Sequence, residues 1–215
     1  MRKLYYSPGA CSLAPHILLE ELGEPYELEL VSIADGKTRT PEYLAINPKG
    51  RVPVLRTDED ELLTEVPAIS WYLAQSRTSP SLFPDGSLDG ARCLEWFNWL
   101  SGTVHAMAFG QLWRPQRFVR DEALFPPVSA KGRENVGDNF RCIETRMQDR
   151  HWAIGPAYTV VDPYLLVFYR WGNRIGLDMR RDYPAWSNHA ERLLERPAVQ
   201  RALQQEGVSV LERVA

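Results

Sequence analysis

The chain has 215 residues, of which 44% are hydrophobic and 25% are charged, and its formal net charge at pH 7 is −3. This length allows one or two domains with a substantial core, and the slight acidity argues against nucleic acid or an anionic membrane as the main partner. No apolar run approaches the ~18 residues needed to span a bilayer, so we expect a soluble globular protein with no membrane partner.

The cysteines Cys11, Cys93 and Cys142 are odd in number and far apart in the sequence. They form no CxxC pair, no zinc-ligand spacing and no disulfide framework. The N-terminus shows no signal-peptide pattern. We therefore expect a cytoplasmic protein with reduced thiols and no bound metal.

The first predicted elements are a strand and a helix joined by a sharp turn. Residues 3–6 form a short apolar run that suits a buried strand, and Ser7-Pro8-Gly9 then breaks it. Apolar residues recur at helical spacing over 13–22, and Gly23 follows as a C-cap.

This arrangement places Cys11 and Ser12 at the N-terminus of a helix. The positive end of the helix dipole favours an anion there, and a thiol in that position can have a pKa below its usual ~8.5. Cys11 is therefore a candidate reactive thiolate, activated by the dipole and by Ser12. The alternative is that Ser12 is only an N-cap and Cys11 a small turn residue.

The next elements complete a small α/β unit. Residues 26–31 alternate apolar and acidic side chains, as a half-exposed strand does. Strand, helix and strand in so short a span predict a βαβ unit with parallel pairing. Residues 52–56 and 61–64 predict a hairpin, and Pro67 marks the start of another helix. We expect a βαβ-ββα domain over residues 1–77.

The second half of the chain has a different pattern. Residues 78–89 are rich in helix and strand breakers and predict a linker. Helical periodicity then begins at Leu94 and continues over 133–149, 160–175 and 186–204, with no strand after Thr64. We expect an all-helical domain over 90–215. Its interruptions are expected at Pro115, Pro126 and Pro127.

Thr159 and Asp162 fit the start of the predicted helix at 160–175. Thr159 suits the N-cap, and Asp162 is placed to reach back to it as in a capping box. Aspartate is shorter than the usual Glu or Gln, and we expect both residues to be structural rather than catalytic.

Five segments in this order resemble the cytosolic glutathione transferases, and within them the bacterial beta class. They are residues 4–13 (LYYSPGACSL), 47–55 (NPKGRVPVL), 63–65 (LTE), 158–165 (YTVVDPYL) and 195–200 (ERPAVQ). The resemblance implies an α/β thioredoxin-like N-terminal domain, an all-α C-terminal domain that supplies a hydrophobic co-substrate site, and a homodimer.

The resemblance also implies a glutathione site. Pro53 would follow a cis peptide bond, so that the backbone of Val52 pairs with the cysteinyl part of glutathione. From the residues alone, the alternative is an ordinary trans bond at the start of an edge strand. Glu65 and Val66 would hold the γ-glutamyl end, because a helix N-terminus suits its carboxylate and Glu65 its ammonium. Alternatively, Glu65 is only a favourable acidic residue at a helix start.

Other site residues are carried over from the family. They are Lys37 for the glycyl carboxylate, Arg51 and Tyr6 near glutathione, Asn98 reaching across a dimer interface, and His105 beside the reactive cysteine. The alternatives are a satisfied core residue for His105 and strand core for Tyr6. The remaining histidines, His16, His151 and His189, have no recognisable constellation around them.

The implied function is that of a glutathione transferase, with glutathione as co-substrate. It conjugates glutathione to small hydrophobic electrophiles, or performs thiol–disulfide exchange through Cys11 with thiol transferase or peroxidase side activity. The alternative is a non-catalytic relative that binds hydrophobic ligands or a protein. Val66, Thr103 and Ala106 favour that alternative, because each replaces a residue that the family usually has.

Overall fold

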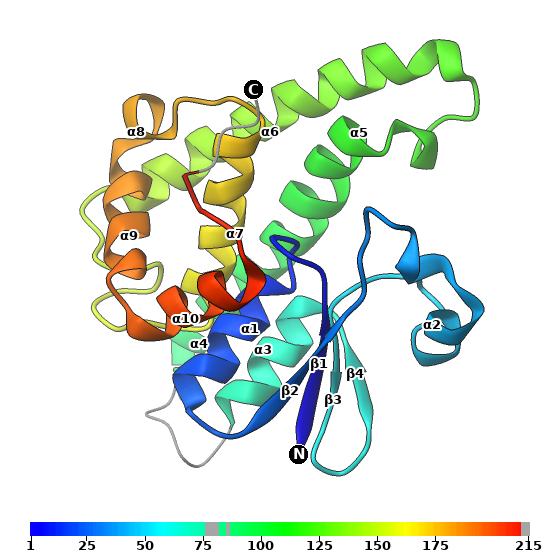
Figure 1. Ribbon diagram of the computed structural model, residues 1–215. Coiled ribbons are helices and arrows are strands. Elements are labelled where there is room, and N and C mark those ends of the chain that lie inside the picture. The colour runs from blue at the N-terminus through cyan, green and yellow to red at the C-terminus, as the bar shows by residue number, and fades with distance from the viewer. Residues whose placement is uncertain (76–81, 85–86, 212–215) are drawn as a thin grey trace.

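The computed structural model describes residues 1–75, 82–84 and 87–211. The N-terminal part contains a four-stranded sheet of order β2-β1-β3-β4 (Figure 1). Its strands are β1 (Arg2–Tyr6), β2 (Tyr26–Leu30), β3 (Val54–Arg56) and β4 (Leu62–Thr64). β1 is parallel to β2 and antiparallel to β3, and β3 is antiparallel to β4. The predicted βαβ unit and hairpin are both confirmed.

The sheet is covered on both faces because successive side chains of β1 point to opposite sides. Leu4 packs with the helices α1 (Leu13–Leu22) and α3 (Val66–Ala74) in the main core. Tyr5 packs in a smaller core on the other face, with Tyr43 of α2 (Pro41–Ile46). A short 3₁₀ turn, η1 (Lys37–Arg39), precedes α2.

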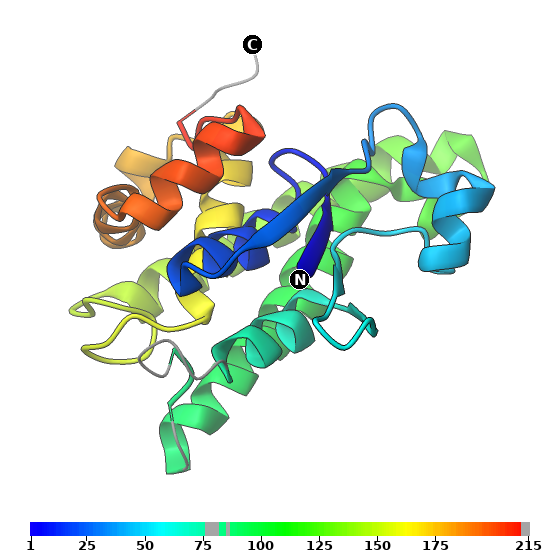
Figure 2. The same ribbon diagram turned by 60° about the horizontal axis from the view of Figure 1, so that its bottom comes forward.

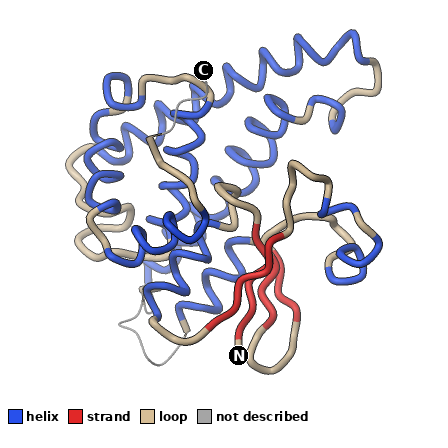
Figure 3. The backbone as a smooth tube through the Cα atoms, viewed as in Figure 1, coloured by secondary structure: helices blue, strands red, loops and turns tan. Residues whose placement is uncertain are grey.

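The second half is helical, as predicted, and Figure 3 shows the strands confined to the N-terminal part. The helical segments are α4 (Ser87–Asn98), η2 (Trp99–Phe109), α5 (Gly110–Trp113), η3 (Pro115–Arg117), η4 (Glu122–Leu124), α6 (Phe125–Met147), α7 (Val161–Arg174), α8 (Met179–Asp182), α9 (Pro184–Leu194) and α10 (Pro197–Glu206). η2 is an 11-residue π-helix that continues α4 without a break. Among the described residues, no named strand follows Thr64.

Two expectations about where helices begin and end are wrong. Pro126 and Pro127 do not interrupt a helix but lie in the first turn of α6, where a missing N–H leaves no intrahelical bond unmade. The predicted helix over 186–204 is two helices, because Pro197 begins α10 after α9 has ended. Pro115 does begin a separate 3₁₀ turn.

The predicted linker at 78–89 falls partly outside the described residues, at 78–81 and 85–86. Positions 87–89 belong to the first turn of α4. The domain boundaries at 77 and 90 therefore stay a prediction.

The helix α7 is the centre of the molecule. Almost all of its residues are buried, and it contacts α1 of the N-terminal part as well as α4, α8 and α9. α10 lies along α1, as Figure 2 shows. Within the part of the chain that the structure describes, no helix is long and apolar enough to cross a membrane.

The expected bond from Asp162 back to Thr159 is present at the start of α7, but Thr159 is not the N-cap: that position is Val160, where no side-chain capping bond is made. The Thr159 N–H donates to Asp162 Oδ2 at 2.7 Å, and the Thr159 hydroxyl donates to the same oxygen at 3.0 Å. The other carboxylate oxygen of Asp162 accepts from the Ala153 N–H at 2.9 Å and contacts His189 Nε2 at 2.7 Å. Asp162 is fully buried, so these bonds hold the helix start in place.

Candidate active site

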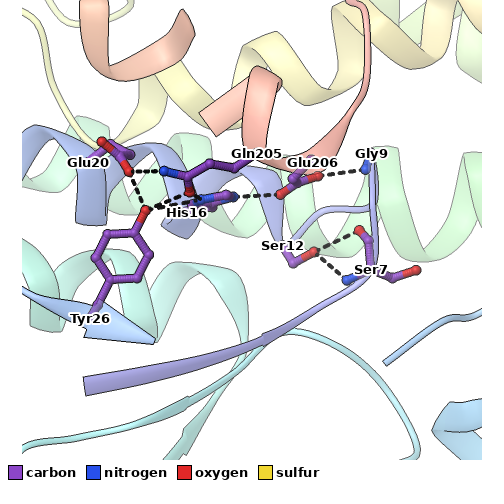
Figure 4. Close-up of polar contacts among 8 residues, drawn as sticks. All are labelled: Ser7, Gly9, Ser12, His16, Glu20, Tyr26, Gln205 and Glu206. Atoms are coloured by element: carbon purple, nitrogen blue, oxygen red, sulfur yellow. Dashed lines mark hydrogen bonds and ion pairs between the residues drawn. The ribbon is translucent and has the colours of Figure 1, made fainter. Parts of the chain in front are cut away.

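Cys11 lies in the loop between β1 and α1, and Ser12 closes that loop on itself (Figure 4). The Ser12 hydroxyl accepts from the Ser7 N–H at 3.2 Å and donates to the Ser7 carbonyl at 3.2 Å. Ser12 occupies the N-cap position of α1, yet its side chain makes no capping bond. The alternative that Ser12 serves only as an N-cap is therefore not supported, because its hydroxyl is used to fold the preceding turn.

Gly9 is the point at which the helical half holds this loop. The Gly9 carbonyl accepts from Trp171 Nε1 at 2.9 Å and from Arg170 Nη1 at 3.3 Å. The Gly9 N–H donates to Glu206 Oε2 at 2.7 Å. Its φ is +65°, and a Cβ at this position would lie 2.5 Å from the Arg170 guanidinium. Glycine is the residue that adopts this positive φ without strain and leaves room for the Arg170 guanidinium.

Glu206 belongs to a buried polar network that joins α10 to α1 (Figure 4). Its Oε1 lies 2.8 Å from His16 Nδ1, and both side chains are fully buried. His16 Nε2 lies 2.8 Å from Gln205 Oε1 and 3.2 Å from the Tyr26 hydroxyl. The expectation that His16 has no constellation around it is therefore wrong.

Cys11 is only 7% exposed, and its thiol contacts the Val52 carbonyl at 3.5 Å. Burial raises the pKa of the Cys11 thiol to about 12, against the lowering effect of its own backbone N–H. The Glu65 and Glu206 carboxylates raise the pKa further, and the Arg51 charge lowers it. The predicted thiolate is therefore wrong for the ligand-free protein, because desolvation outweighs the helix N-terminus.

The Val52–Pro53 peptide bond is cis, as the resemblance implied. The ladders of β3 begin only at Val54, so the backbone of Val52 lies outside the sheet pairing. The preceding Arg51 carbonyl is held by Asn47 Nδ2 at 2.7 Å and by the Tyr43 hydroxyl at 2.9 Å. The backbone of Val52 is thus held in a fixed position beside the Cys11 thiol, where an extended peptide could pair with it.

Glu65 precedes α3 with an unusual backbone. Its φ is +74°, which costs a non-glycine residue about 1–3 kcal/mol and is commonest at functional sites. Its carboxylate lies 2.5 Å from Lys49 Nζ, and both side chains are about half exposed. Val66 is the first residue of α3, so its N–H has no partner within the helix. A free N–H at a helix N-terminus is typical of a site that binds an anion. The Val66 side chain is buried.

His105 is packed in an aromatic cluster from the helical half. Its ring centroid is 4.9 Å from that of Trp171 and 6.2 Å from that of Phe168. Burial lowers the pKa of His105 to about 4, and the charges of Arg51 and Arg117 lower it further. The imidazole is therefore neutral at pH 7. The ring packs against aromatic side chains but is only partly buried from solvent, and it lies within reach of the Arg51 charge.

The structure brings some of the predicted residues together and separates others. One group is connected by the contact between Cys11 and Val52 and by the charges of Arg51 and Glu65, which act on both Cys11 and His105. Ser12, Pro53 and Val66 are the chain neighbours of this group.

Tyr6, Lys37 and Asn98 are not part of that group. The ring of Tyr6 lies 5.9 Å from that of His16, on the side of the buried network. Lys37 and Asn98 are exposed, on η1 and at the end of α4.

Sequence reasoning did not identify the residues that hold the Cys11 loop from the helical half, which are Arg170, Trp171 and Glu206. Nothing local in the sequence indicates that a residue of α7 or α10 bonds a loop more than 160 positions earlier. The described residues contain no group of three His, Cys, Asp or Glu side chains placed to hold a metal ion.

Two family models match this chain. The model described as "Glutathione S-transferase, N-terminal domain" matches residues 9–76, and "Glutathione S-transferase, C-terminal domain" matches 120–197. Together they cover Cys11, the cis peptide bond, Glu65 and all of α7.

The chain is also similar to known proteins over almost its whole length. It is 35% identical over 208 residues to glutathione S-transferase GstA of Escherichia coli O157:H7, covering 96% of this chain and 99% of that protein. A crystal structure of a glutathione transferase homologue from Sulfitobacter with bound glutathione superposes with a TM-score of 0.90 at 30% identity, covering 97% and 99% of the two chains. A bacterial beta class glutathione S-transferase from Sphingomonas chungbukensis gives a TM-score of 0.82 at 33% identity, covering 96% and 100%.

Proposed function

Because the chain belongs to the glutathione S-transferase family, we propose that it binds glutathione beside Cys11 and transfers it to hydrophobic electrophiles. The observation on which this mainly depends is the fixed position of Val52, whose backbone lies outside the sheet and next to the Cys11 thiol. An extended tripeptide with a central thiol matches such an arrangement. The name of GstA and the bound glutathione of the Sulfitobacter homologue support the same ligand.

In this proposal the γ-glutamyl end of glutathione lies at the start of α3. Its α-carboxylate accepts from the Val66 N–H, and its ammonium binds the Glu65 carboxylate, in place of Lys49 or beside it. Val66 supplies no hydroxyl, so the backbone N–H is the donor there. The glycyl carboxylate points towards Lys37 and Arg51.

The chemical step is a nucleophilic substitution in which the glutathione sulfur attacks the electrophile after its thiol has lost a proton. The bound thiol loses its proton to solvent, the sulfur forms a bond to the electrophilic carbon, and the leaving group departs with the bonding electron pair. Arg51 supplies positive charge that stabilises the glutathione thiolate. His105 is neutral at pH 7 and faces that charge, so its role is to fill and shape the site rather than to add a charge.

Thiol–disulfide exchange through Cys11 is a second activity in this proposal. Cys11 would attack a disulfide of glutathione, release one glutathione thiolate and hold the other half as a mixed disulfide, which a further glutathione reduces. The contact between the Cys11 thiol and the Val52 carbonyl favours it, because the cysteinyl part of glutathione would lie there. The raised pKa of Cys11 argues that this exchange is slow in the ligand-free protein.

We also propose the division of labour that the sequence implies. Residues 1–77 bind glutathione, residues 90–215 supply the hydrophobic co-substrate site, and two copies form a homodimer. The exposure of Asn98 at the end of α4, on a face where Leu94 is 51% exposed, supports a partner at this surface. The three unpaired cysteines support a reducing cytoplasm as the location.

The test is retention on immobilised glutathione, followed by two activity measurements. Wild type and Cys11→Ala are compared for conjugation of 1-chloro-2,4-dinitrobenzene and for reduction of a glutathione mixed disulfide, with Cys142→Ala as the control. We expect retention and conjugation in all three proteins, and loss of disulfide reduction in Cys11→Ala alone. Retention without either activity in wild type would favour the non-catalytic alternative, and failure of wild type to be retained would overturn the proposal.

A further inference from the structure

Four arginines from both halves of the chain gather near the candidate active site. Arg39 ends η1, Arg51 precedes the cis peptide bond, and Arg114 and Arg117 lie between α5 and the end of η3. All four side chains are exposed. Partial burial lowers the pKa of Arg117, and the charges of Arg51, Arg114 and Arg39 lower it further. Arg51 and Arg117 also act on His105, so the cluster extends to the site itself.

Within the described part of the chain, no ion pair joins any of these four guanidinium groups to a carboxylate. Other arginines of the protein do have such partners, for example Arg146 with Glu95 at 2.9 Å and Arg196 with Glu21 at 2.7 Å. The carboxylate that acts on both Cys11 and His105 is Glu65, and it is paired with Lys49. The cluster is therefore an excess of positive charge, which favours an anionic ligand.

Two partly exposed aromatic residues, Trp113 and Phe118, flank the arginines of the helical half in the sequence. Trp113 is 37% exposed, and its ring packs on those of Phe109 at 4.7 Å and Trp171 at 5.1 Å. Phe118 is also 37% exposed and lies over Gly110, where a Cβ would be 3.4 Å from its ring. Apolar faces and guanidinium groups therefore occur together on one short segment, which suits a planar ligand with an acidic group.

Glutathione does not account for the whole cluster. It has two carboxylates and one ammonium, and one of those carboxylates is assigned to the start of α3. The other, the glycyl carboxylate, is assigned to Lys37 and Arg51 of the N-terminal half, which also contributes Arg39. Arg114 and Arg117 come from the segment after α5, drawn in green, which faces the segment before α2 in both ribbon views (Figures 1 and 2). Arg114 and Arg117 are therefore available to bind the second substrate.

We propose that the electrophile of this enzyme has a carboxylate or sulfonate on an aromatic body, and that Arg114 and Arg117 bind that acidic group. This proposal rests on the proposed glutathione transferase function and names the substrate class of the same site. Trp113 and Phe118 pack against the aromatic body, and the reacting carbon is thereby directed towards the glutathione sulfur beside Cys11.

The test compares two electrophiles that share a ring and a leaving group, 4-chloro-3,5-dinitrobenzoate and its neutral amide. The proteins are wild type, the double variant Arg114→Gln/Arg117→Gln and the control Arg120→Gln, an exposed arginine that is not among the charges acting on Arg117 or His105. We expect wild type to favour the benzoate in kcat/KM, and the double variant to lose about tenfold of that preference through KM. The control should match wild type, and added salt should weaken the preference.

A binding measurement makes the outcome independent of turnover. Quenching of tryptophan fluorescence gives the Kd of unreactive 3,5-dinitrobenzoate and of 3,5-dinitrobenzamide for the same proteins. We expect wild type and Arg120→Gln, which both keep Arg114 and Arg117, to bind the anion more tightly than the amide. The double variant should bind the two ligands equally. Equal binding of anion and amide by wild type overturns the proposal even if the enzyme conjugates both. Anion-selective binding in a protein that neither binds nor conjugates glutathione would overturn the transferase function and keep the anion site.

Discussion

Gly9 and Glu206 are 197 positions apart, and the Gly9 N–H donates a 2.7 Å hydrogen bond to the Glu206 carboxylate. The other oxygen of that carboxylate lies 2.8 Å from His16 Nδ1. One buried side chain at the end of α10 thus fixes both the loop before Cys11 and a histidine inside α1. The last helix of the chain is therefore part of the support of the site, although it contributes nothing to the glutathione contacts proposed above.

Replacing Glu206 with alanine should destabilise the protein by about 2–4 kcal/mol, because the Gly9 N–H and His16 would both lose a buried partner. Glu206→Gln keeps an acceptor for one of them and should cost less. The free energy of unfolding from urea denaturation measures this. Glu195→Ala, an exposed glutamate just before α10, is the matched control and should change little. Equal stability of Glu206→Ala and wild type would show that the network does not hold the two halves together.

The raised pKa of Cys11 predicts an unreactive thiol in the ligand-free protein. With a pKa of about 12, only about one molecule in 10⁵ is a thiolate at pH 7. Iodoacetamide should therefore label the exposed Cys142 first, and Cys11 only slowly. Intact mass followed by peptide mapping identifies the modified residue. The Cys142→Ala variant should remain largely unlabelled at pH 7, and rapid labelling of Cys11 in it would contradict the assigned pKa.

Much of the fold follows from local sequence patterns. The alternation in β2, the C-cap at Gly23 with φ +66° and the parallel pairing with β1 all depend on residues within one short segment. Pro126 and Pro127 were misassigned because a proline pair fits the first turn of a helix as well as a break, and periodicity does not separate the two.

The site was predicted less completely than the fold, for physical reasons. The position of Cys11 followed from the turn and the helix spacing, but its pKa did not. Desolvation by distant segments decides that pKa, and sequence spacing does not reveal it. Two of the partners of His16, Glu206 and Gln205, are likewise some 190 positions away. The cis bond before Pro53 was predicted by resemblance alone, since trans is the usual state of such bonds.

The lowered pKa of His105 predicts a loss of stability in acid. In the unfolded chain the imidazole takes up a proton near pH 6.5, whereas in the folded protein it does so only near pH 4. The unfolded state therefore binds more protons between these values, and the free energy of unfolding falls as the pH falls through that window. His105→Phe keeps an aromatic ring against Trp171 and should remove on the order of 1–2 kcal/mol of this pH dependence. Urea denaturation at pH 7 and at pH 4.5 gives the change in the free energy of unfolding between these two pH values. His151→Phe, at an exposed histidine, is the control, and parallel pH profiles for wild type and His105→Phe would refute the assignment.

Val66→Ser tests whether the start of α3 binds the γ-glutamyl carboxylate. A serine hydroxyl there would add a donor to the backbone N–H, so the Kd for glutathione should fall by several-fold, as one further hydrogen bond of about 1 kcal/mol predicts. Val66 is only 4% exposed, and the smaller, polar side chain should at the same time lower the free energy of unfolding by about 1–2 kcal/mol. Calorimetric titration with glutathione and urea denaturation give the two quantities separately. Val66→Ala is the matched control, because it loses the same packing without gaining a hydroxyl. If Val66→Ser and Val66→Ala bind glutathione equally well, the carboxylate does not lie at this helix start, and the orientation of the tripeptide proposed above is wrong.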